Sequence, residues 1–266
     1  MKSRVLFVSI LTIVFVWSCT KVPITGRRQM KLLPDAKLIQ LSNQEYAKFI
    51  AANTVVAATD SNSVLVKKVG NKIAMEIQKF LATQKQSKRL NGYKWEFNLI
   101  QSNTVNAWCM PGGKVVVYTG LLPVTKDENG LAVVMGHEIA HAIANHGNER
   151  MSQQLAIQMG GTALAVAMDQ NPTQTAAIFN QCYGIGSSLG ALAYSRKHES
   201  EADKLGLCFM AMAGYDPNTA VGFWERMSKT GGAAPPQILS THPSDATRIK
   251  DIKEYMPKAM KFYKKP

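Results

Sequence analysis

The feature that most constrains the fold is an apolar stretch, residues 131–144, whose only titratable side chains are His137, Glu138 and His141. Four residues of helix advance about 400°, so the two histidines share one helix face roughly one turn apart. Two imidazoles at that spacing can hold one Zn²⁺, and Glu138 can reach a water on the open side of the metal as a general base. The alternative is a chance match, but a charged Glu in a buried helix is costly without a function.

The flanking sequence predicts that this helix runs from Asp127 to His146. Thr125 and Glu128 have the spacing of a capping box, and Gly147 is expected to end the helix. Small residues recur every four positions and form a stripe against which a second helix can pack closely: Ala132, Gly136, Ala140 and Ala144.

A zinc peptidase site has three protein ligands and one open position, so the two histidines require a partner from elsewhere. We predict that Glu199, on a helix expected from about Leu189 to Ala213, is the third ligand. Asp203 shares its face and is expected to accept a hydrogen bond from the second nitrogen of a ligating histidine. Glu201 points about 160° away from Asp203 and is expected at the surface. An ordinary solvated helix face is the alternative for this run.

Two β-rich runs, residues 106–110 and 114–119, flank Pro111-Gly112-Gly113 and predict a hairpin, preceded by a strand at 93–100. In a zinc peptidase, an edge strand beside the metal can pair with an extended substrate backbone. The candidates for that edge are Asn106, Ala107 and Trp108. A purely structural hairpin is the alternative.

Helical patterns dominate the rest of the chain, so we predict a mostly helical α+β fold with a small antiparallel sheet or hairpin beside the helix that carries His137 and His141. Residues 41–90 indicate two helices separated by a polar break near 59–63. Residues 151–195 contain no Lys or Arg and one acid, Asp169, and Asn171-Pro172 divides them into two helices. Recurring polar residues favour a buried or membrane-touching helical hairpin over two membrane spans.

Residues 1–18 predict a targeting segment, because Lys2 and Arg4 precede a short apolar run. Ser18-Cys19 is similar to a bacterial lipoprotein cleavage site, so Cys19 is expected to carry lipid; a plain signal peptide or an uncleaved anchor is the alternative. We expect a tether at 19–40, a folded domain at 41–266, and a lipid-anchored location in the bacterial cell envelope, facing the periplasm.

The formal net charge of +13 becomes +11 without Lys2 and Arg4. No nucleic-acid motif accompanies this charge, so we expect no nucleic-acid partner; the excess indicates a solvated basic surface or attraction to an anionic membrane. Because the chain lacks a C-x-x-C motif, no cysteine is assigned to the metal. With Cys19 lipidated, three cysteines remain and at most one disulfide can form.

Several motifs occur in an order that resembles the HtpX and prenyl-protease family of zinc metallopeptidases. They begin with His137-Glu138-x-x-His141 and Glu199-x-x-Ala202-Asp203. Supporting matches are Asn106-Ala107, Thr119-Gly120-Leu121, Ser195-Arg196, Gly214-Tyr215-Asp216-Pro217 and Thr241-His242-Pro243. The resemblance covers about residues 23–255 and is nearest to BepA-like periplasmic peptidases, although this chain is expected to lack their TPR repeat domain.

The resemblance implies a zincin-like domain that holds one Zn²⁺ through His137, His141 and Glu199, with Glu138 as the base. It also places His242 near the metal, either as a latency plug in the fourth position or as an oxyanion stabiliser; a free surface loop is the alternative. Arg248 is similar to a family arginine near the site.

We therefore predict a zinc-dependent endopeptidase that cleaves polypeptides, such as misfolded or envelope proteins, by Glu-assisted attack of zinc-bound water. The alternative is a non-catalytic, lipid-anchored chaperone or assembly factor on the same fold. A membrane transporter does not fit, because the chain lacks the necessary spans.

Overall fold

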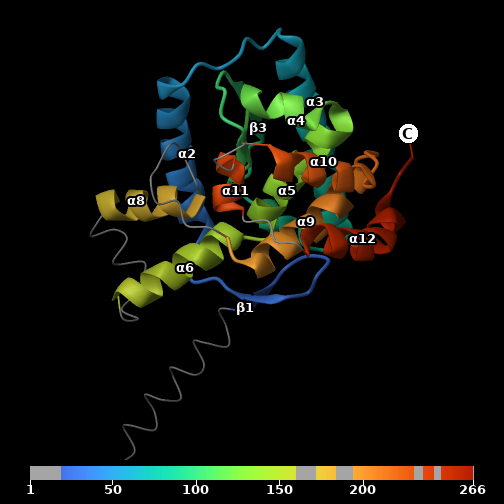
Figure 1. Ribbon diagram of the computed structural model, residues 1–266. Helices are drawn as coiled ribbons and strands as arrows, with labels where there is room; N and C mark the ends of the chain where they lie inside the picture. Colours follow the sequence, from blue (N-terminus) through green and yellow to red (C-terminus); the bar gives the residue numbers. More distant parts are fainter. Residues whose placement is uncertain (1–18, 160–171, 184–193, 231–235, 243–246, 266) are drawn as a thin grey trace, which may run out of the picture.

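The computed structural model describes residues 19–159, 172–183, 194–230, 236–242 and 247–265 (Figure 1). The predicted targeting segment at 1–18 and the predicted helix break at Asn171 lie outside the described residues. Figure 1 shows α5 (Glu128–Ile143) in the middle of the molecule, with α9 (Arg196–Met212) packed against it. These two helices carry most of the predicted metal ligands, and the other elements surround them.

Helix α5 begins at the predicted position, although Asp127 and not the predicted capping box of Thr125 and Glu128 caps it, and the helix ends earlier than predicted. The Asp127 side chain accepts a hydrogen bond from the Gly130 backbone nitrogen at 2.8 Å and caps the helix. The helix ends at Ile143 because Asn145 adopts a left-handed conformation (φ +56°), which asparagine tolerates better than most residues. Helix α6 (His146–Met159) starts immediately afterwards and contains Gly147. The predicted extension to His146 and the predicted stop at Gly147 are therefore wrong.

Helices α5 and α9 approach each other closely through glycine. A Cβ atom on Gly136 would lie 3.0 Å from the carbonyl oxygen of Gly206 on α9. Gly136 belongs to the small-residue stripe predicted from the sequence, and that prediction of close helix packing is confirmed here.

The sheet contains β3 (Glu96–Ile100), β4 (Ala107–Met110) and β5 (Lys114–Tyr118) in the order β3-β5-β4. Strands β4 and β5 form the predicted antiparallel hairpin, whose turn uses positive φ angles at Gly112 and Gly113. Strand β3 pairs with β5 in parallel, so the sheet is mixed, whereas we predicted an antiparallel one. The chain crosses from β3 to the far edge of the sheet before the hairpin returns, which leaves β4 at the edge.

Side-chain alternation along β4 divides the core into two parts. Ala107 and Cys109 belong to the main core, which includes α3 (Ser61–Thr83), α5 and α9. Trp108 and Met110 point to a second cluster, which includes α2 (Asp35–Ala52) and α8 (Pro172–Tyr183). The sheet therefore lies with one face toward the helices that carry the site.

Helices α2 and α3 confirm the predicted pair of helices between residues 41 and 90. The Asp60 side chain accepts hydrogen bonds from the backbone nitrogens of Asn62 and Ser63 and caps α3 after the polar break. Helix α2 starts at Asp35, inside the segment that we expected to be a tether.

The rest of that segment also packs against the domain. Strands β1 (Cys19–Lys21) and β2 (Arg28–Met30) form an antiparallel hairpin, and Val22 and Leu33 are each 2% exposed. In Figure 1 this hairpin runs beneath α6 and α9. Its turn places Arg27 against these two helices.

Short elements complete the domain. They are η1 (Ser87–Leu90), η2 (Thr119–Leu121), α4 (Leu122–Thr125), α10 (Thr219–Lys229), α11 (Gln237–Thr241), α12 (Arg248–Ala259) and η3 (Met260–Phe262). None of the helices in the described part of the chain has the length and apolar character of a membrane span. The predicted fold class, a mostly helical α+β domain with a small sheet, is confirmed.

Candidate metal centre

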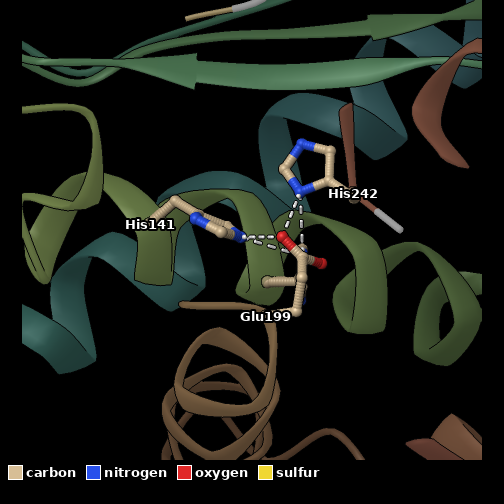
Figure 2. Close-up of side chains that lie close together, drawn as sticks. His141, Glu199 and His242 are labelled. Carbon is tan, nitrogen blue, oxygen red and sulfur yellow. Dashed lines mark hydrogen bonds and ion pairs between the residues drawn. The ribbon is translucent and has the colours of Figure 1, made fainter. Parts of the chain in front are cut away.

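Four buried side chains meet between α5, α9 and the end of α11: His137, His141, Glu199 and His242. One donor atom from each lies within 4.8 Å of the others. Figure 2 shows Glu199 extending from α9 toward His141, with His242 approaching the same carboxylate from the opposite side. Three elements that are far apart in the sequence thus direct nitrogen and oxygen donors to one point.

The distances within this cluster suit a single ion. The Nε2 atoms of His137 and His141 are 3.1 Å apart, and His242 Nδ1 lies 3.3 Å from His137 Nε2. The Glu199 carboxylate lies 3.4 Å from His137 Nε2, 3.3 Å from His141 Nε2 and 3.1 Å from His242 Nδ1. Three ring nitrogens and a carboxylate facing one another are the donors that Zn²⁺ prefers.

Burial and neighbouring charges set the protonation of these groups. Burial opposes ionisation of Glu199, but His242 and His141 hold the pKa of its carboxyl well below the usual range. Burial lowers the pKa of His141 well below its usual value. Burial acts against the charged form of His137 too, but Asp203 and Glu199 raise its pKa to about 9. The two carboxylates thus favour the protonated form of His137, whereas metal ligation requires the neutral imidazole.

A chain of contacts supports His137 from behind. Its Nδ1 atom lies 2.9 Å from Asp203 Oδ1, which also accepts a hydrogen bond from Arg248 Nη2 at 2.7 Å. The Arg248 guanidinium lies 3.3 Å from the ring centroid of Trp224, whose ring also contacts His137. A neutral His137 that donates its Nδ1 proton to Asp203 has Nε2 available for a metal. Sequence reasoning missed Trp224 as part of the site.

Glu138 lies beside the four-residue cluster but does not belong to it. Its Oε2 atom is 3.6 Å from His242 Nε2, and its Oε1 atom is buried with no hydrogen-bond partner among the described residues. Burial raises the pKa of this carboxyl. A buried carboxylate with a raised pKa and a free acceptor oxygen is suited to take a proton from a water molecule.

Sequence reasoning also missed His146 and Tyr194. His146 Nδ1 lies 3.0 Å from His141 Nδ1, and the Tyr194 ring lies 4.1 Å from the His141 ring. His146 was assigned to the same helix as His141, which hid this contact. Its Nε2 atom lies 3.0 Å from Glu201, which is only 5% exposed. The expectation that Glu201 lies at the surface is therefore wrong, because α6 and the N-terminal hairpin cover that face of α9.

The three candidate edge residues occupy different environments. The Trp108 side chain packs against Tyr46 and Phe49, away from the metal ligands. Ala107 faces the main core, and Asn106 Nδ2 donates to Gln237 Oε1 at 3.2 Å. The Ile238 backbone nitrogen donates to the Val105 carbonyl oxygen at 3.3 Å. Helix α11 therefore lies against the chain just before β4.

Among the cysteines whose side chains the structure describes, none belongs to the four-residue cluster. Cys109, Cys182 and Cys208 are buried free thiols. The candidate cluster itself offers nitrogen and oxygen donors.

Comparison with known proteins identifies the family. The profile described as "Peptidase family M48" matches residues 69–256. The chain belongs to peptidase family M48. This membership and the cluster confirm the predicted enzyme class, a metallopeptidase, and zinc as its cofactor. The resemblance stated from the sequence holds at this family level, whereas the narrower assignment to HtpX is not supported.

Relatives fall into two groups. The mitochondrial metalloendopeptidase OMA1 of Schizosaccharomyces pombe is 38% identical over 172 residues, 64% of this chain and 49% of that protein. The human metalloendopeptidase OMA1 is 31% identical over 264 residues, 95% of this chain and 49% of that protein. The beta-barrel assembly-enhancing protease of Escherichia coli is 30% identical over 168 residues, 60% of this chain and 34% of that protein. The chain thus spans about half the length, or less, of these curated relatives.

These relatives correct the predicted location. The OMA1 proteins of fission yeast, Arabidopsis thaliana, budding yeast and human are all named as mitochondrial. This conflicts with the expectation of a bacterial, periplasm-facing lipoprotein anchored through Cys19, and that predicted location is wrong.

Proposed function

We propose that the chain is an endopeptidase that uses one zinc ion to hydrolyse peptide bonds in unfolded polypeptides. The observation that carries this proposal is the meeting of His137, His141, Glu199 and His242 beside a buried carboxylate, Glu138, whose Oε1 atom lacks a hydrogen-bond partner among the described residues. Family membership and the names of the OMA1 relatives support it.

The residues divide the chemistry among themselves. His137, His141 and Glu199 would hold the zinc ion, which would supply Lewis-acid chemistry toward water and the scissile carbonyl. Glu138 accepts the proton of the attacking water and passes it to the leaving amine. Asp203 and Arg248 keep His137 in the ligating tautomer.

The free edge of strand β4 is a reason to propose an extended polypeptide as the substrate. Val116 pairs with Trp108 and Val117 with Ala107 across the hairpin, and the Tyr118 backbone nitrogen donates to the Asn106 carbonyl oxygen. In an antiparallel pair, hydrogen-bonded and non-bonded positions alternate, so the Ala107 backbone groups point away from β5. The Ala107 N–H now donates to Asn106 Oδ1 at 2.9 Å, and a substrate strand would replace that bond. An extended substrate strand can pair with this edge.

We also propose that the described conformation is a resting state. His242 places Nδ1 among the donors, and α11 contacts Val105 and Asn106 beside the same edge. Tyr194 holds this segment in place, because its backbone nitrogen donates to the Thr241 carbonyl oxygen at 2.8 Å. Substrate would then need to displace His242 and α11. The competing role for His242 is stabilisation of the oxyanion in the open enzyme.

The test compares zinc-loaded protein with two variants on the same helix, using unfolded casein as substrate. Glu138→Gln is expected to retain zinc and to lose cleavage by at least about 100-fold, a general base being typically worth 10²–10⁴-fold. Glu128→Gln, a half-buried change on the first turn that affects only the ion pair with Lys68, should cleave like the wild type.

Two results would contradict the proposal. One is full zinc content and suppression of casein aggregation, with no fragments from either the wild type or the His242→Ala variant, which favours the chaperone alternative. The other is normal cleavage by Glu138→Gln, which removes this residue from the mechanism.

A further inference from the structure

A hydrogen-bonded network connects the N-terminal hairpin to the metal centre. The turn between β1 and β2 is closed by a hydrogen bond from the Val22 backbone nitrogen to the Arg27 carbonyl oxygen at 2.8 Å. From this turn, the Arg27 side chain enters between α6 and α9 and remains only 14% exposed. It is the point at which a distant part of the sequence meets both helices.

The Arg27 guanidinium binds two carboxylates at once. Its Nη1 and Nη2 atoms donate to the two oxygens of Glu149 on α6 at 3.0 and 2.7 Å. Its Nε atom donates to Glu201 Oε2 on α9 at 2.6 Å, and Thr25 donates to the other oxygen of Glu201. A planar guanidinium is the side chain best suited to hold two carboxylates in fixed directions.

From Glu201 the network reaches a metal ligand in two steps. His146 Nε2 lies 3.0 Å from Glu201 Oε2, and His146 Nδ1 lies 3.0 Å from His141 Nδ1. If His141 binds a metal through Nε2, its Nδ1 must carry the proton. His146 must then accept a hydrogen bond at Nδ1 from His141 and donate one from its Nε2–H to Glu201. Only one arrangement of protons satisfies all these contacts.

A second branch of the network reaches the other ligand helix. His198 Nε2 lies 3.1 Å from Glu149 Oε2, and His198 immediately precedes Glu199. The rings of His146 and His198 are stacked at 4.6 Å, with an angle of 22° between their planes. The branch through His146 and the branch through His198 are therefore in contact with each other, and each leads to a candidate metal ligand.

We propose that Arg27 is a positioning residue of the metal centre, which acts through Glu201 and His146 to fix the tautomer and direction of His141. This inference rests on the zinc site proposed above. Carboxylate–histidine pairs behind metal ligands contribute to metal affinity. Here the carboxylate is held by an arginine from the N-terminal hairpin, so metal affinity depends on a segment outside the residues matched to the family.

A purely structural ion pair would attach the hairpin without affecting the metal. Two readouts separate these roles: the zinc dissociation constant, measured by competition with a chromophoric chelator, and the d–d absorption of the Co²⁺-substituted protein. The variants are Arg27→Gln, Arg27→Lys, His146→Phe and the double variant Arg27→Gln/His146→Phe. Arg28→Ala is the matched control, because Arg28 is the exposed neighbour of Arg27 and the first residue of β2.

Arg27→Gln should weaken zinc binding about tenfold, the lower end of the range for groups behind a ligand, and should change the Co²⁺ spectrum. Arg27→Lys keeps the positive charge but cannot bind two carboxylates at once, and it should restore part of the zinc affinity. This variant also provides the test if Arg27→Gln does not fold. In the His146→Phe background, Arg27→Gln should cause no further loss.

Three results would overturn the proposal. The first is zinc affinity and Co²⁺ spectra of both Arg27 variants equal to those of Arg28→Ala, even if Tm falls. The second is a full tenfold loss in the His146→Phe background, because the effect would then bypass His146. The third is wild-type protein that binds no zinc, which removes the proposed function as well; the first two results leave that function intact.

Discussion

A Cβ atom on Gly206 of α9 would lie 2.9 Å from the backbone nitrogen of His137 on α5. Gly206 follows Asp203 by three residues and Glu199 by seven, so all three share one helix face. Direct backbone contact at Gly206 thus places the Glu199 carboxylate opposite the two histidines. Helices α5 and α9 can approach this closely because Gly206 has no side chain.

Gly206→Ala is therefore expected to push α9 away from α5. We expect a loss of about 1–3 kcal/mol in unfolding free energy from overpacking, together with weaker zinc binding. Chemical denaturation and zinc competition measure the two effects. Gly222→Ala is the control, because its nearest neighbour is the Arg226 side chain at 3.4 Å, and this variant should match the wild type. Equal stability and affinity for Gly206→Ala would contradict the packing argument.

Glu199→Ala should lose zinc after dialysis, because the site loses its only described carboxylate donor. Asp203→Ala should retain zinc with about 10–100-fold weaker affinity, since its contact to His137 Nδ1 supports the ligand indirectly. The exposed residue Glu225 provides a control, and Glu225→Ala should bind like the wild type. Stoichiometric zinc in dialysed Glu199→Ala would remove Glu199 from the ligand set.

His242→Ala tests the resting state. If His242 and α11 block the site, this change should raise basal casein cleavage several-fold at equal zinc content. A decrease of about 10²–10³-fold at equal zinc content would instead assign His242 to the oxyanion. Ser240→Ala, an exposed change on the same short helix, should leave the rate unchanged.

Glu149 makes the stability of the metal-free protein depend on pH. Burial opposes its ionisation, but hydrogen bonds from His198 and Arg27 lower its pKa to about 2 from an ordinary 4.5. A depressed carboxyl pKa contributes stability above the unfolded pKa, and this contribution is lost as the pH falls toward about 2.

Glu149→Gln should therefore lower Tm by roughly 2–8 °C near neutral pH, because hydrogen bonds to charged groups contribute about 1.5–3 kcal/mol. The difference from the wild type should shrink as the pH falls below 4.5. Thermal denaturation between pH 7 and 3 measures this, and a constant difference would show that the charge of Glu149 is not responsible.

Local patterns predicted the parts of the site that belong to single elements. The spacing of His137 and His141 follows from helix geometry alone, and the hairpin before α5 was evident from Pro111-Gly112-Gly113. Glu199 was assigned because a two-histidine zinc site needs a carboxylate, and the structure brings it to the same point.

The parts that sequence reasoning missed depend on contacts between distant segments. Glu201 has the helical position of a surface residue, and it is buried only because Arg27 and His146 come to it from elsewhere. The hydrophobic periodicity of a sequence describes one helix at a time. It does not reveal which distant segments cover the polar faces of that helix. The parallel pairing of β3 with β5 was missed for the same reason.

The left-handed residue Asn145 determines more than the end of a helix. In one continuous helix, His146 would be rotated by about 140° from His141, and its ring could not return to the ligand. The two-residue joint instead folds α6 back, so that His146 lies against His141 Nδ1. The same short joint restricts how far α6, which binds Arg27 through Glu149, can move relative to α5, which carries two of the candidate metal ligands. Helix α6 therefore contacts the candidate metal ligand His141 through its first residue, His146, and contacts Arg27 one turn later through Glu149.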